Sequence, residues 1–286
     1  METKRKAVCS GVVAALCLLL LVLPGAAADG TEPTVLSCTQ VPMYIDGEYI
    51  GSGILMDAVT YVPLRTFTEH ILQEPCEATW DQDAGTATLR TDRLTVSITL
   101  GQGYMSANGR MIYLGDAAYN VNGTILVPIR ELARMLGLAL TWDTDRWAIH
   151  IDDSAWSVPV SGDSYYGGEE LYWLSRVICS EAANQPLEGM IGVGNVVLNR
   201  LNDPTGQFGG SVSEVIFQYG QFDVVASGMI YCEPSDAATV AAKLCLEGYN
   251  TVGQSKWFVN PRIGISTWMR LNKTYYCTIA DHDFYA

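Results

Sequence analysis

The chain has 286 residues, and its 31 acidic residues outnumber its 17 lysines and arginines, so the formal net charge is −14. A protein this acidic is a poor candidate for binding nucleic acid or any other polyanion. Hydrophobic residues make up 49% of the sequence and charged residues 17%, which is typical of folded, globular protein and excludes a largely disordered chain.

The first residues have the pattern of a secretory signal peptide. Basic residues at positions 4 to 6 precede an apolar run over residues 12–23, and a triplet of alanines follows at positions 26–28. This order predicts a signal peptide over residues 1–28, cleaved after Ala28. An uncleaved anchor is the alternative, although the run is short for a bilayer span. We therefore expect an exported protein with no stable membrane span after cleavage, and with room for two domains.

Cysteines beyond the signal peptide fall in even numbers on both halves of the chain. Even counts in an exported protein suggest one disulfide in the first half and two in the second, with free buried thiols as the alternative. A zinc site is not expected, because there is no Cys-x-x-Cys and the three histidines are scattered. We expect no metal and no cofactor. The six cysteines are Cys38 and Cys76, then Cys179, Cys232, Cys245 and Cys277.

Two segments of the first half resemble each other. Residues 60–89 and 124–151 share Val-Pro-Leu/Ile-Arg, an amphipathic stretch, Thr-Trp-Asp and an alternating apolar run, with an offset of 62 to 65 residues. Such self-similarity predicts a duplicated supersecondary unit. The Val-Pro pair ends an extended stretch and begins a helix, which extends to Gly137 in the second copy. The Trp-Asp-x-Asp sequence then turns into a hairpin.

A strand pair is predicted ahead of each copy. Residues 43–50 contain a tight turn at Asp46-Gly47, and residues 104–114 contain one at Asn108-Gly109. Each unit is therefore expected to be rich in strands and to contain one helix. For the tryptophans of the two Thr-Trp-Asp motifs, core packing at the junction of helix and hairpin is favoured over stacking on a ligand. These are Trp80 and Trp142.

The second half is predicted to be mostly helical. Residues 153–170 have Ser, Gly, Pro and acidic residues without periodicity, so we expect a linker. Helices are then predicted over 171–182, from Pro186 to Arg200, and over 237–248. Two later segments, 257–261 and 274–286, look extended. The fold class is therefore α+β, with a duplicated β-rich domain over residues 40–152 followed by a mostly helical domain over 171–286.

Glu181 is the most informative residue of the second half. It lies at the end of a predicted helix, next to the apolar residues Val177, Ile178 and Cys179. Lost solvation and the negative end of the helix dipole both raise the pKa of such a carboxyl group. A carboxylic acid that is still protonated near neutral pH can protonate a glycosidic oxygen as the bond breaks. A solvated glutamate at a helix end is the alternative, and spacing alone favours it.

Both halves resemble known families. Residues 171–286 resemble the catalytic domain of the SleB-type cell-wall hydrolases, the spore cortex-lytic enzymes. Residues 40–152 resemble the copper amine oxidase N-terminal domain, which is found duplicated in many exported proteins. No copper site is expected there, because His70 and His150 are isolated. The segments that carry the first resemblance are SEAANQPLEGMIGVGNVVLNR (180–200), VIFQYGQFDVVASG (215–228), WFVNP (257–261) and IADHDFY (279–285).

The resemblance implies a secreted enzyme that degrades peptidoglycan, associated with the cell wall or the spore. Members have a lysozyme-like, mostly helical domain and cut the glycan strand between N-acetylmuramic acid, or its cortex derivative, and N-acetylglucosamine. One glutamate, in the position of Glu181, protonates the leaving oxygen while the 6-hydroxyl of the substrate closes on the anomeric carbon. Such an enzyme is a lytic transglycosylase. A cell-wall or spore-coat partner is the expectation for the first domain.

Three alternatives remain open. A two-carboxylate hydrolase needs a second acid about 5 to 9.5 Å from the first. Asp223, Glu188 and Glu214 are candidates for it, although helix capping explains Glu188 and Asp223 stands where relatives have a hydroxyl residue. The second alternative is a non-catalytic protein that binds the wall. The third, an amidase or peptidase, would need zinc ligands or a Cys-His pair, and only Cys179 hints at one.

Several further residues are candidates for contacts with the substrate. Amides and hydroxyls hydrogen-bond sugar hydroxyls and N-acetyl groups, and aromatic rings pack on apolar sugar faces. A structural role is the alternative for the phenylalanine, the asparagine and the histidine among them. The candidates are Gln221, Phe222, Asn260, His282 and Tyr285.

Three residues near these candidates are given other roles. Asn199 and Arg200 are expected to tie the helix end to the terminal segment. Ala280 stands where the family usually has glycine, which leaves the backbone path beside His282 open.

Overall fold

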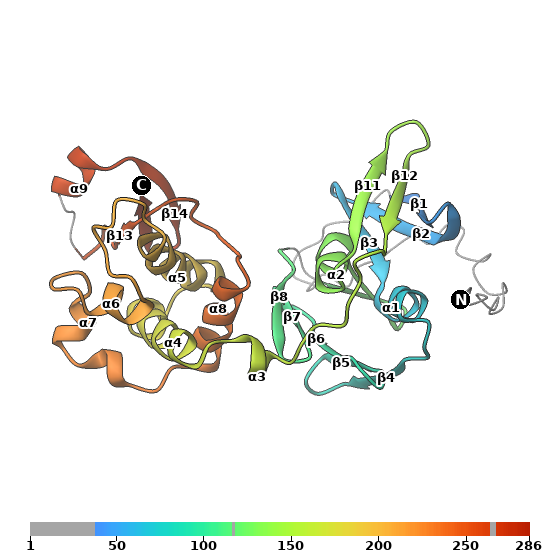
Figure 1. Ribbon diagram of the computed structural model, residues 1–286, viewed down its shortest axis with the longest axis horizontal. Coiled ribbons are helices and arrows are strands. Elements are labelled where there is room, and N and C mark those ends of the chain that lie inside the picture. The colour runs from blue at the N-terminus through green and yellow to red at the C-terminus, as the bar shows by residue number, and fades with distance from the viewer. Residues whose placement is uncertain (1–37, 116–117, 264–266) are drawn as a thin grey trace, which may run out of the picture. The chain divides into compact units, whose positions relative to one another are not determined.

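The computed structural model describes residues 38–115, 118–263 and 267–286. The described residues form two compact units, one from residues 38–102 and 118–158, and one from residues 103–115, 159–263 and 267–286 (Figure 1). The predicted signal peptide lies outside the described residues. Within the described part of the chain, no helix is both long enough and apolar enough to cross a bilayer.

A seven-stranded sheet forms most of the first unit. Its strand order is β11-β12-β1-β2-β3-β10-β9. The strands β1 and β12 are parallel, and the other neighbours are antiparallel. The bounds are β1 Thr39–Ile45, β2 Glu48–Met56, β3 Val59–Pro63, β9 Tyr119–Val121, β10 Thr124–Pro128, β11 Ala139–Asp143 and β12 Ala148–Asp152.

The hairpin β1–β2 turns where the sequence predicts. Asp46 and Gly47 have φ values of 51° and 81°. Left-handed backbone at both central residues is the requirement of a type I′ turn, whose twist matches that of the flanking strands. The turn sets a register in which alternate residues of β1, namely Val41, Met43 and Ile45, are buried.

Two helices pack on strands of this sheet, α1 (Leu64–Leu72) and α2 (Ile129–Met135). Pro63 and Pro128 are their N-cap residues, because the proline ends the preceding strand and its fixed φ suits the start of a helix. The helix α2 ends before Gly137, earlier than predicted. Each helix leads into a hairpin: β4 (Glu77–Asp81) with β5 (Thr86–Arg90) after α1, and β11 with β12 after α2. A further strand, β6 (Thr95–Thr99), pairs with β5.

The core role expected for Trp80 and Trp142 is wrong. Their relative exposures are 40% and 43%. Trp80 lies on β4, all of whose residues are exposed, and Trp142 lies on β11, which is an edge strand of the large sheet. Both hairpins therefore present their tryptophans to solvent, and the helices supply the buried side chains instead, among them Leu64, Phe67 and Ile71 of α1.

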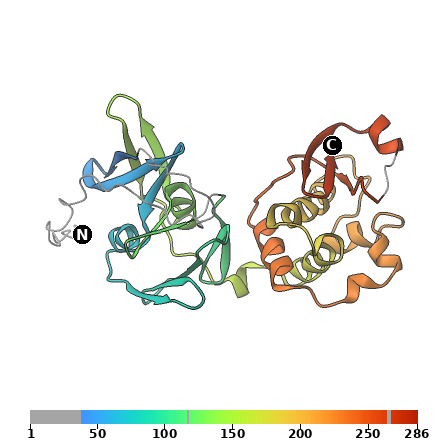
Figure 2. The same cartoon turned by 180° about the vertical axis from the view of Figure 1, so that it is seen from behind.

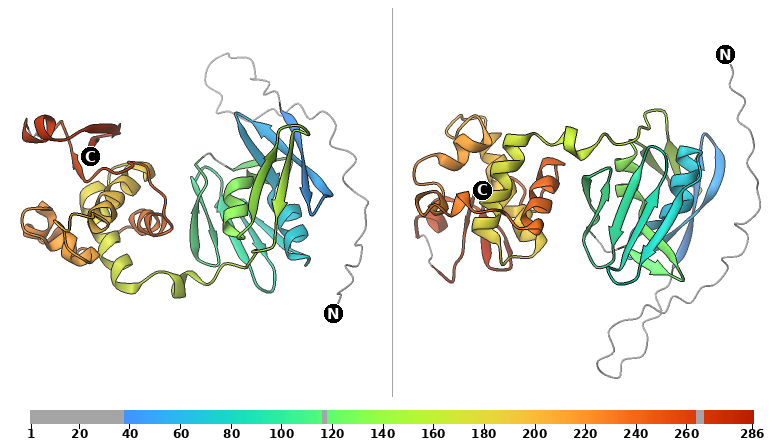
Figure 3. Two further views of the ribbon diagram at one scale, coloured as in Figure 1. Left: turned by 45° about the horizontal axis from the view of Figure 1, so that its top comes forward. Right: turned by 90° about the horizontal axis from the view of Figure 1, so that it is seen from below.

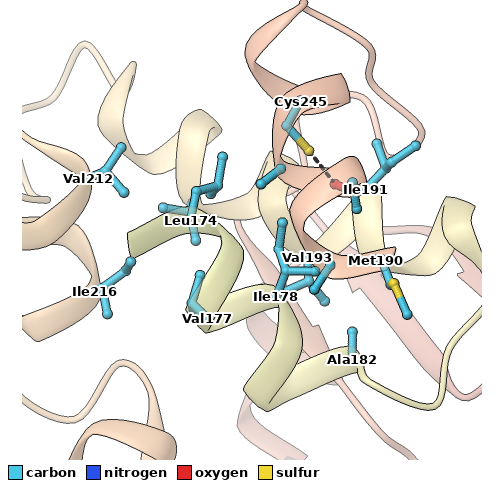
Figure 4. Packing of buried hydrophobic residues seen from close by; sticks show 14 of the residues in the cluster. Leu174, Val177, Ile178, Ala182, Met190, Ile191, Val193, Val212, Ile216 and Cys245 are labelled. Atoms are coloured by element: carbon cyan, nitrogen blue, oxygen red, sulfur yellow. Dashed lines mark hydrogen bonds between the residues drawn. The ribbon is translucent and has the colours of Figure 1, made fainter. Parts of the chain in front are cut away.

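Helices form most of the second unit, and α4, α5 and α8 pack pairwise against one another (Figure 4). The core includes Leu174, Val177 and Ile178 of α4 and Val193 of α5, and each of these has no exposed surface. The bounds are α3 Gly162–Tyr165, α4 Gly168–Ala182, α5 Leu187–Leu201, α6 Val212–Phe217, α7 Asp223–Ala226, η1 Met229–Tyr231, α8 Asp236–Leu246 and α9 Thr267–Asn272.

The connection between α4 and α5 agrees with the sequence pattern. Pro186 is the N-cap residue of α5, one position earlier than its predicted place inside the helix. Close packing follows at Gly194, where an added Cβ would lie 2.6 Å from Sγ of Cys245 and 2.8 Å from Cδ1 of Ile178. The glycine therefore lets α5 approach both α4 and α8.

A small antiparallel sheet completes the second unit, in the order β13-β15-β14. Its strands are β13 (Trp257–Val259), β14 (Tyr275–Ile279) and β15 (His282–Tyr285), and β13 contacts α5 (Figures 2 and 3). Phe284 has no exposed surface and packs with Val196 and Val252. Since side chains alternate along a strand, His282 shares the inner face with Phe284, and Tyr285 lies on the opposite face.

The second unit also contains a hairpin from the first half of the sequence, β7 (Tyr104–Ala107) with β8 (Arg110–Tyr113). Arg110 donates to both carboxylate oxygens of Glu247, at 2.9 and 2.6 Å. Tyr166 donates to Glu247 at 2.9 Å and accepts from the backbone N–H of Met111 at 2.8 Å. The expected linker therefore includes α3 and this structural tyrosine.

The disulfides expected from the even cysteine counts do not form. All six cysteines among the described residues are free, as in the alternative left open by the sequence. Cys245 is 2% exposed and its thiol donates to the carbonyl oxygen of Ile191 at 3.3 Å (Figure 4). Burial raises the pKa of this thiol, so it acts as a small core residue.

The contact between α5 and the small sheet predicts the effect of Gly192→Ala. An added Cβ would lie 2.8 Å from Cζ of Phe284 and 2.9 Å from Cγ1 of Val252. Overpacking costs about 1 to 3 kcal/mol, which exceeds the roughly 1 kcal/mol that alanine contributes to a helix. We expect a lower thermal midpoint by circular dichroism. Gly168→Ala is the control, since nothing lies within 4 Å of its added Cβ, and an unchanged midpoint for Gly192→Ala would contradict the contact.

Candidate active site

Glu181 lies in the last turn of α4, on the helix whose apolar face forms the core of the second unit. Its pKa is raised from 4.5 to about 7. Burial is the largest cause, and the negative charge of Asp223 acts in the same direction, while the positive charge of Arg200 opposes them. No hydrogen bond joins the carboxyl group to another described residue, so at neutral pH the group is poised between its acid and base forms.

Arg200 is the cation whose charge lowers the pKa of this carboxyl group. It lies at the end of α5, is 4% exposed, and donates from Nε to the carbonyl oxygen of Lys256 at 2.7 Å. Burial lowers the pKa of its guanidinium to about 10, against the charge of Glu181, which raises it. The group therefore stays charged at neutral pH and limits how far the pKa of Glu181 rises.

Arg200 and Asn199 hold the backbone ahead of β13. The amide of Asn199 donates to the carbonyl oxygens of Gly253 and Ser255, each at 2.8 Å. The end of α5 is thus tied to residues 253–256 rather than to the terminal segment expected from the sequence. Arg200 was expected to have this tying role alone, and its electrostatic coupling to Glu181 was missed. One signal in the sequence could have indicated this coupling: one predicted helix ends near an acid, Glu181, and the next helix ends in a cation, Arg200.

Three aromatic rings lead from Arg200 toward the small sheet. The guanidinium carbon of Arg200 lies 5.0 Å from the ring centroid of Phe222, which is 6% exposed. The ring of Phe222 lies 6.5 Å from Phe258, and Phe258 lies 5.2 Å from His282. The structure therefore brings the predicted residues Glu181, Phe222 and His282 to one region, linked by Arg200 and Phe258.

Two buried polar atoms of this region lack a hydrogen bond. They are Nη1 of Arg200 and Nδ1 of His282, and neither has a partner among the described residues. His282 is 5% exposed, and burial lowers the pKa of its imidazole, so the ring is neutral near pH 7. Unsatisfied buried groups are costly, which makes both atoms candidates for hydrogen bonds to a bound ligand.

The other predicted contact residues lie elsewhere or have structural partners. Asn260 accepts from the backbone N–H of Arg262 at 2.9 Å, a turn interaction that needs no ligand. Gln221 lies half-buried just ahead of α7. Tyr285 lines a hollow of about 460 Å³ on the outer face of the small sheet, with Lys273 and Arg270. The structure thus does not bring Tyr285 together with His282.

Among the candidate second carboxylates, Asp223 is the one coupled to Glu181. It is exposed and begins α7. Glu188 accepts from the hydroxyl of Tyr113 at 3.0 Å, a partner supplied by the β7–β8 hairpin. Glu214 accepts from the backbone N–H of Gly210 at 2.7 Å, while Ser211 accepts from the backbone N–H of Glu214 at 3.2 Å. This arrangement resembles a capping box, with the N–H of Gly210 in place of that of the N-cap residue Ser211, and it explains Glu214 without chemistry.

Over residues 38–115, 118–263 and 267–286, no cluster of three or more His, Cys, Asp or Glu side chains is arranged to hold a metal ion.

Comparison with protein families gives two matches. Residues 184–285 match the family described as Cell Wall Hydrolase, and residues 44–151 match the copper amine oxidase N-terminal domain. Both resemblances predicted from the sequence are confirmed. The first match begins just after Glu181, so the role of this residue depends on its geometry and electrostatics.

Curated relatives match the second unit. The chain is 31% identical over 118 residues to the spore cortex-lytic enzyme of Oceanobacillus iheyensis, covering 41% of this chain and 42% of the relative. It is 30% identical over 119 residues to the spore cortex-lytic enzyme of Bacillus subtilis, covering 39% and 38%. The cell wall hydrolase CwlJ of Bacillus subtilis is 27% identical, covering 39% and 81%. The chain spans less than half of the length of the two cortex-lytic relatives.

Two solved structures are also similar. The catalytic domain of the germination-specific lytic transglycosylase SleB from Bacillus anthracis is 27% identical, with a TM-score of 0.39, and the match covers 42% of this chain and 97% of that domain. The catalytic domain of the Bacillus cereus SleB protein has the same identity and TM-score, covering 42% and 92%.

The raised pKa of Glu181 predicts a pH-dependent cost to stability. Below pH 4.5 the carboxyl is neutral in both the folded and unfolded states, so it has no effect. Between pH 4.5 and about 7 it ionises in the unfolded state but not in the folded state, so stability falls as pH rises and then levels off. We expect Glu181→Gln to remove this loss, about 3 kcal/mol by pH 8, in urea unfolding followed from pH 4 to 8.

The control for this experiment is Glu170→Gln, an exposed glutamate in the first turn of the same helix. A surface substitution of this kind is expected to change the free energy of unfolding by within about 0.5 kcal/mol. If Glu181→Gln gave the same small difference at every pH, the carboxyl would be solvated, as in the alternative that the sequence left open.

Proposed function

We propose that this chain, in which a cell wall hydrolase domain follows a copper amine oxidase N-terminal-like domain, is a secreted enzyme that cleaves peptidoglycan glycan strands. Its reaction is a lytic transglycosylation between N-acetylmuramic acid, or its cortex derivative, and N-acetylglucosamine. The observation that carries the proposal is the half-buried Glu181 carboxyl, whose pKa of about 7 keeps a proton available at neutral pH.

Glu181 acts first as a general acid. Its proton goes to the glycosidic oxygen, the bond from that oxygen to the anomeric carbon breaks, and N-acetylglucosamine leaves. The 6-hydroxyl of the muramic acid residue then bonds to the anomeric carbon and gives its proton back to the Glu181 carboxylate. One carboxyl group thus serves both half-reactions, and no water is consumed. General acid catalysis of this kind contributes about 10² to 10⁴ in rate.

Arg200 and Asp223 adjust the proton affinity of Glu181. The carboxylate that forms after proton transfer is stabilised by the buried guanidinium, while the charge of Asp223 favours return of the proton. The coupling to Asp223 also supports a second candidate function, a hydrolase with two carboxylates. In that mechanism Asp223 would activate water or act as nucleophile, and the product would have an ordinary reducing end.

Substrate hydrogen bonds are assigned to the unsatisfied atoms of Arg200 and His282. Nη1 of Arg200 is a donor, and Nδ1 of His282 donates or accepts according to its tautomer. Both suit sugar hydroxyls or the carbonyl of an N-acetyl group. Gln221 lies close to Phe222 in sequence and is the third contact. Asn260 and Tyr285 are assigned supporting roles. Asn260 already has a hydrogen-bond partner in a turn, and Tyr285 lies on the outer face of the small sheet.

The first unit is proposed to be a duplicated module that holds the enzyme at its substrate. The segments β3–α1–β4–β5 and β10–α2–β11–β12 have the same order of elements, which supports duplication. Export, with cleavage of residues 1–28 and association with the cell wall or spore, is part of the proposal. A wall or coat component is then the partner of this unit.

The nature of the products tests the reaction. Mature protein is incubated with purified peptidoglycan, both spore cortex and vegetative wall, and released fragments are identified by mass spectrometry. We expect fragments ending in anhydro-muramic acid, and at least about a hundredfold less release by Glu181→Gln. Reducing ends instead would support the two-carboxylate hydrolase, to be followed by Asp223→Asn and Glu188→Gln. No release by either protein from either wall would leave a non-catalytic wall-binding protein.

Asp223→Asn is expected to move the pH dependence of the reaction. The charge of Asp223 raises the pKa of Glu181, so its removal lowers that pKa. The fraction of Glu181 that is protonated then falls off at a lower pH, and the alkaline limb of the rate profile shifts the same way. The shift should stay below about one pH unit, because an exposed charge contributes less than about 1 kcal/mol. An unmoved limb with abolished activity would instead indicate direct participation of Asp223.

A further inference from the structure

The hairpins β4–β5 and β11–β12 are built on the same four-residue turn. In the first, Oδ1 of Asp81 accepts from the backbone N–H groups of Asp83 and Ala84, each at 3.0 Å. In the second, Oδ1 of Asp143 accepts from the backbone N–H groups of Asp145 and Arg146, at 2.9 and 3.0 Å. A tryptophan precedes the aspartate in both. The two turns therefore allow a comparison position by position.

The last residue of the turn must adopt left-handed backbone in both hairpins. The first hairpin places Gly85 there, with φ of 60°, and the second places Trp147, with φ of 51°. Glycine adopts this conformation without penalty, whereas a bulky residue in it is a genuine outlier and costs roughly 1 to 2 kcal/mol. The second hairpin thus uses a residue that its backbone disfavours.

Burial does not account for Trp147. Its side chain is 62% exposed, and its ring contacts that of Trp142, itself 43% exposed, at a centroid distance of 5.6 Å and an angle of 80°. The turn of this hairpin projects beyond the neighbouring strands (Figures 1 and 2). Two large rings at a right angle therefore form an open corner at the tip. A strained residue held at an exposed position is a reason to look for function.

The polar groups of this hairpin lie on its other face, because side chains alternate along a strand. Asp143 faces away from Trp142, and its Oδ2 is 3.3 Å from Nε2 of His150 and 4.0 Å from Nε of Arg146. The corner itself offers two aromatic faces, which match the apolar C–H face of a sugar ring.

We propose that Trp142 and Trp147 form a binding site for a neutral glycan, the sugar backbone of the peptidoglycan on which the second unit acts. One ring stacks on the face of a sugar, and the other closes its side. This inference rests on the proposed function for the identity of the polymer. The net charge of −14 disfavours anionic wall polymers as the ligand.

The first hairpin lacks this arrangement. Nε1 of Trp80 donates to the amide oxygen of Gln82 at 2.9 Å, and glycine stands where the second aromatic ring would be. Trp80 is 40% exposed, close to the value for Trp142. A single ring with an internal hydrogen bond offers one face and no corner, so Trp80→Ala is the matched control.

Trp147→Gly separates the effect on binding from the effect on stability, because it places in the second turn the residue type that the first turn has at the same position, Gly85. The full mature chain is compared with and without this change in a Glu181→Gln background, which prevents cleavage of the ligand. The probe is protease-treated peptidoglycan sacculi freed of anionic polymers, and cosedimentation gives the dissociation constant. We expect at least a tenfold weaker association for Trp147→Gly and for Trp142→Ala, unchanged association for Trp80→Ala, and an unchanged or higher melting temperature for Trp147→Gly.

Two outcomes would overturn the proposal. If Trp147→Gly bound the sacculi as tightly as the parent protein, the corner would not be a glycan site. A melting temperature several degrees lower for this variant would show that Trp147 stabilises the hairpin rather than straining it. Weakened association only with sacculi that retain wall proteins would indicate a protein ligand and also reject it. Cleavage of short soluble glycan strands by Trp147→Gly with Glu181 intact tests the second unit separately. If the short strands were not cleaved while the parent protein still bound the sacculi, the proposed function would be rejected and the glycan site would not.

Discussion

The second unit depends on a helix that buries its apolar face while carrying a carboxyl group at its end. Leu174, Val177 and Ile178 anchor α4 in the core, and this anchoring withdraws Glu181 from water one turn later. Loss of solvation, rather than a hydrogen bond, raises the pKa of Glu181. The same packing brings up Arg200 from α5, whose charge keeps that rise moderate. The core thus sets the chemistry of the site as well as its position.

The two units use aromatic side chains differently. Around Glu181 the rings of Phe222 and Phe258 are buried or half-buried and shape a dry environment. On the first unit the tryptophans of both hairpins face solvent, and one hairpin accepts backbone strain to add another. A half-buried acid and an exposed aromatic corner suit the two tasks of an enzyme on an insoluble polymer, which are to break a bond and to stay near the next one.

Local patterns in the sequence predicted the elements well, because turns, prolines and helical periodicity depend on neighbouring residues. The Asp46-Gly47 turn, the start of α5 after Pro186 and the buried end of α4 are examples. Predictions that depend on distant packing did worse. The exposure of Trp80 and Trp142 follows from the edge positions of β4 and β11, the cysteines are free, and the effect of Arg200 on Glu181 requires the packing of α5 against α4. The roles of the individual site residues stay predictions.

The β7–β8 hairpin comes from the first half of the sequence but belongs to the second unit. The chain passes from one unit to the other at residues 102–103, 115–116 and 158–159, and the bidentate pair of Arg110 with the nearly buried Glu247 belongs to the second unit. A fragment cut at residue 171 would lose the hairpin and Tyr166, and would leave the Glu247 carboxylate inside the protein without its cation. A truncation meant to isolate the second unit must therefore retain residues 103–115 as well as residues 159–286.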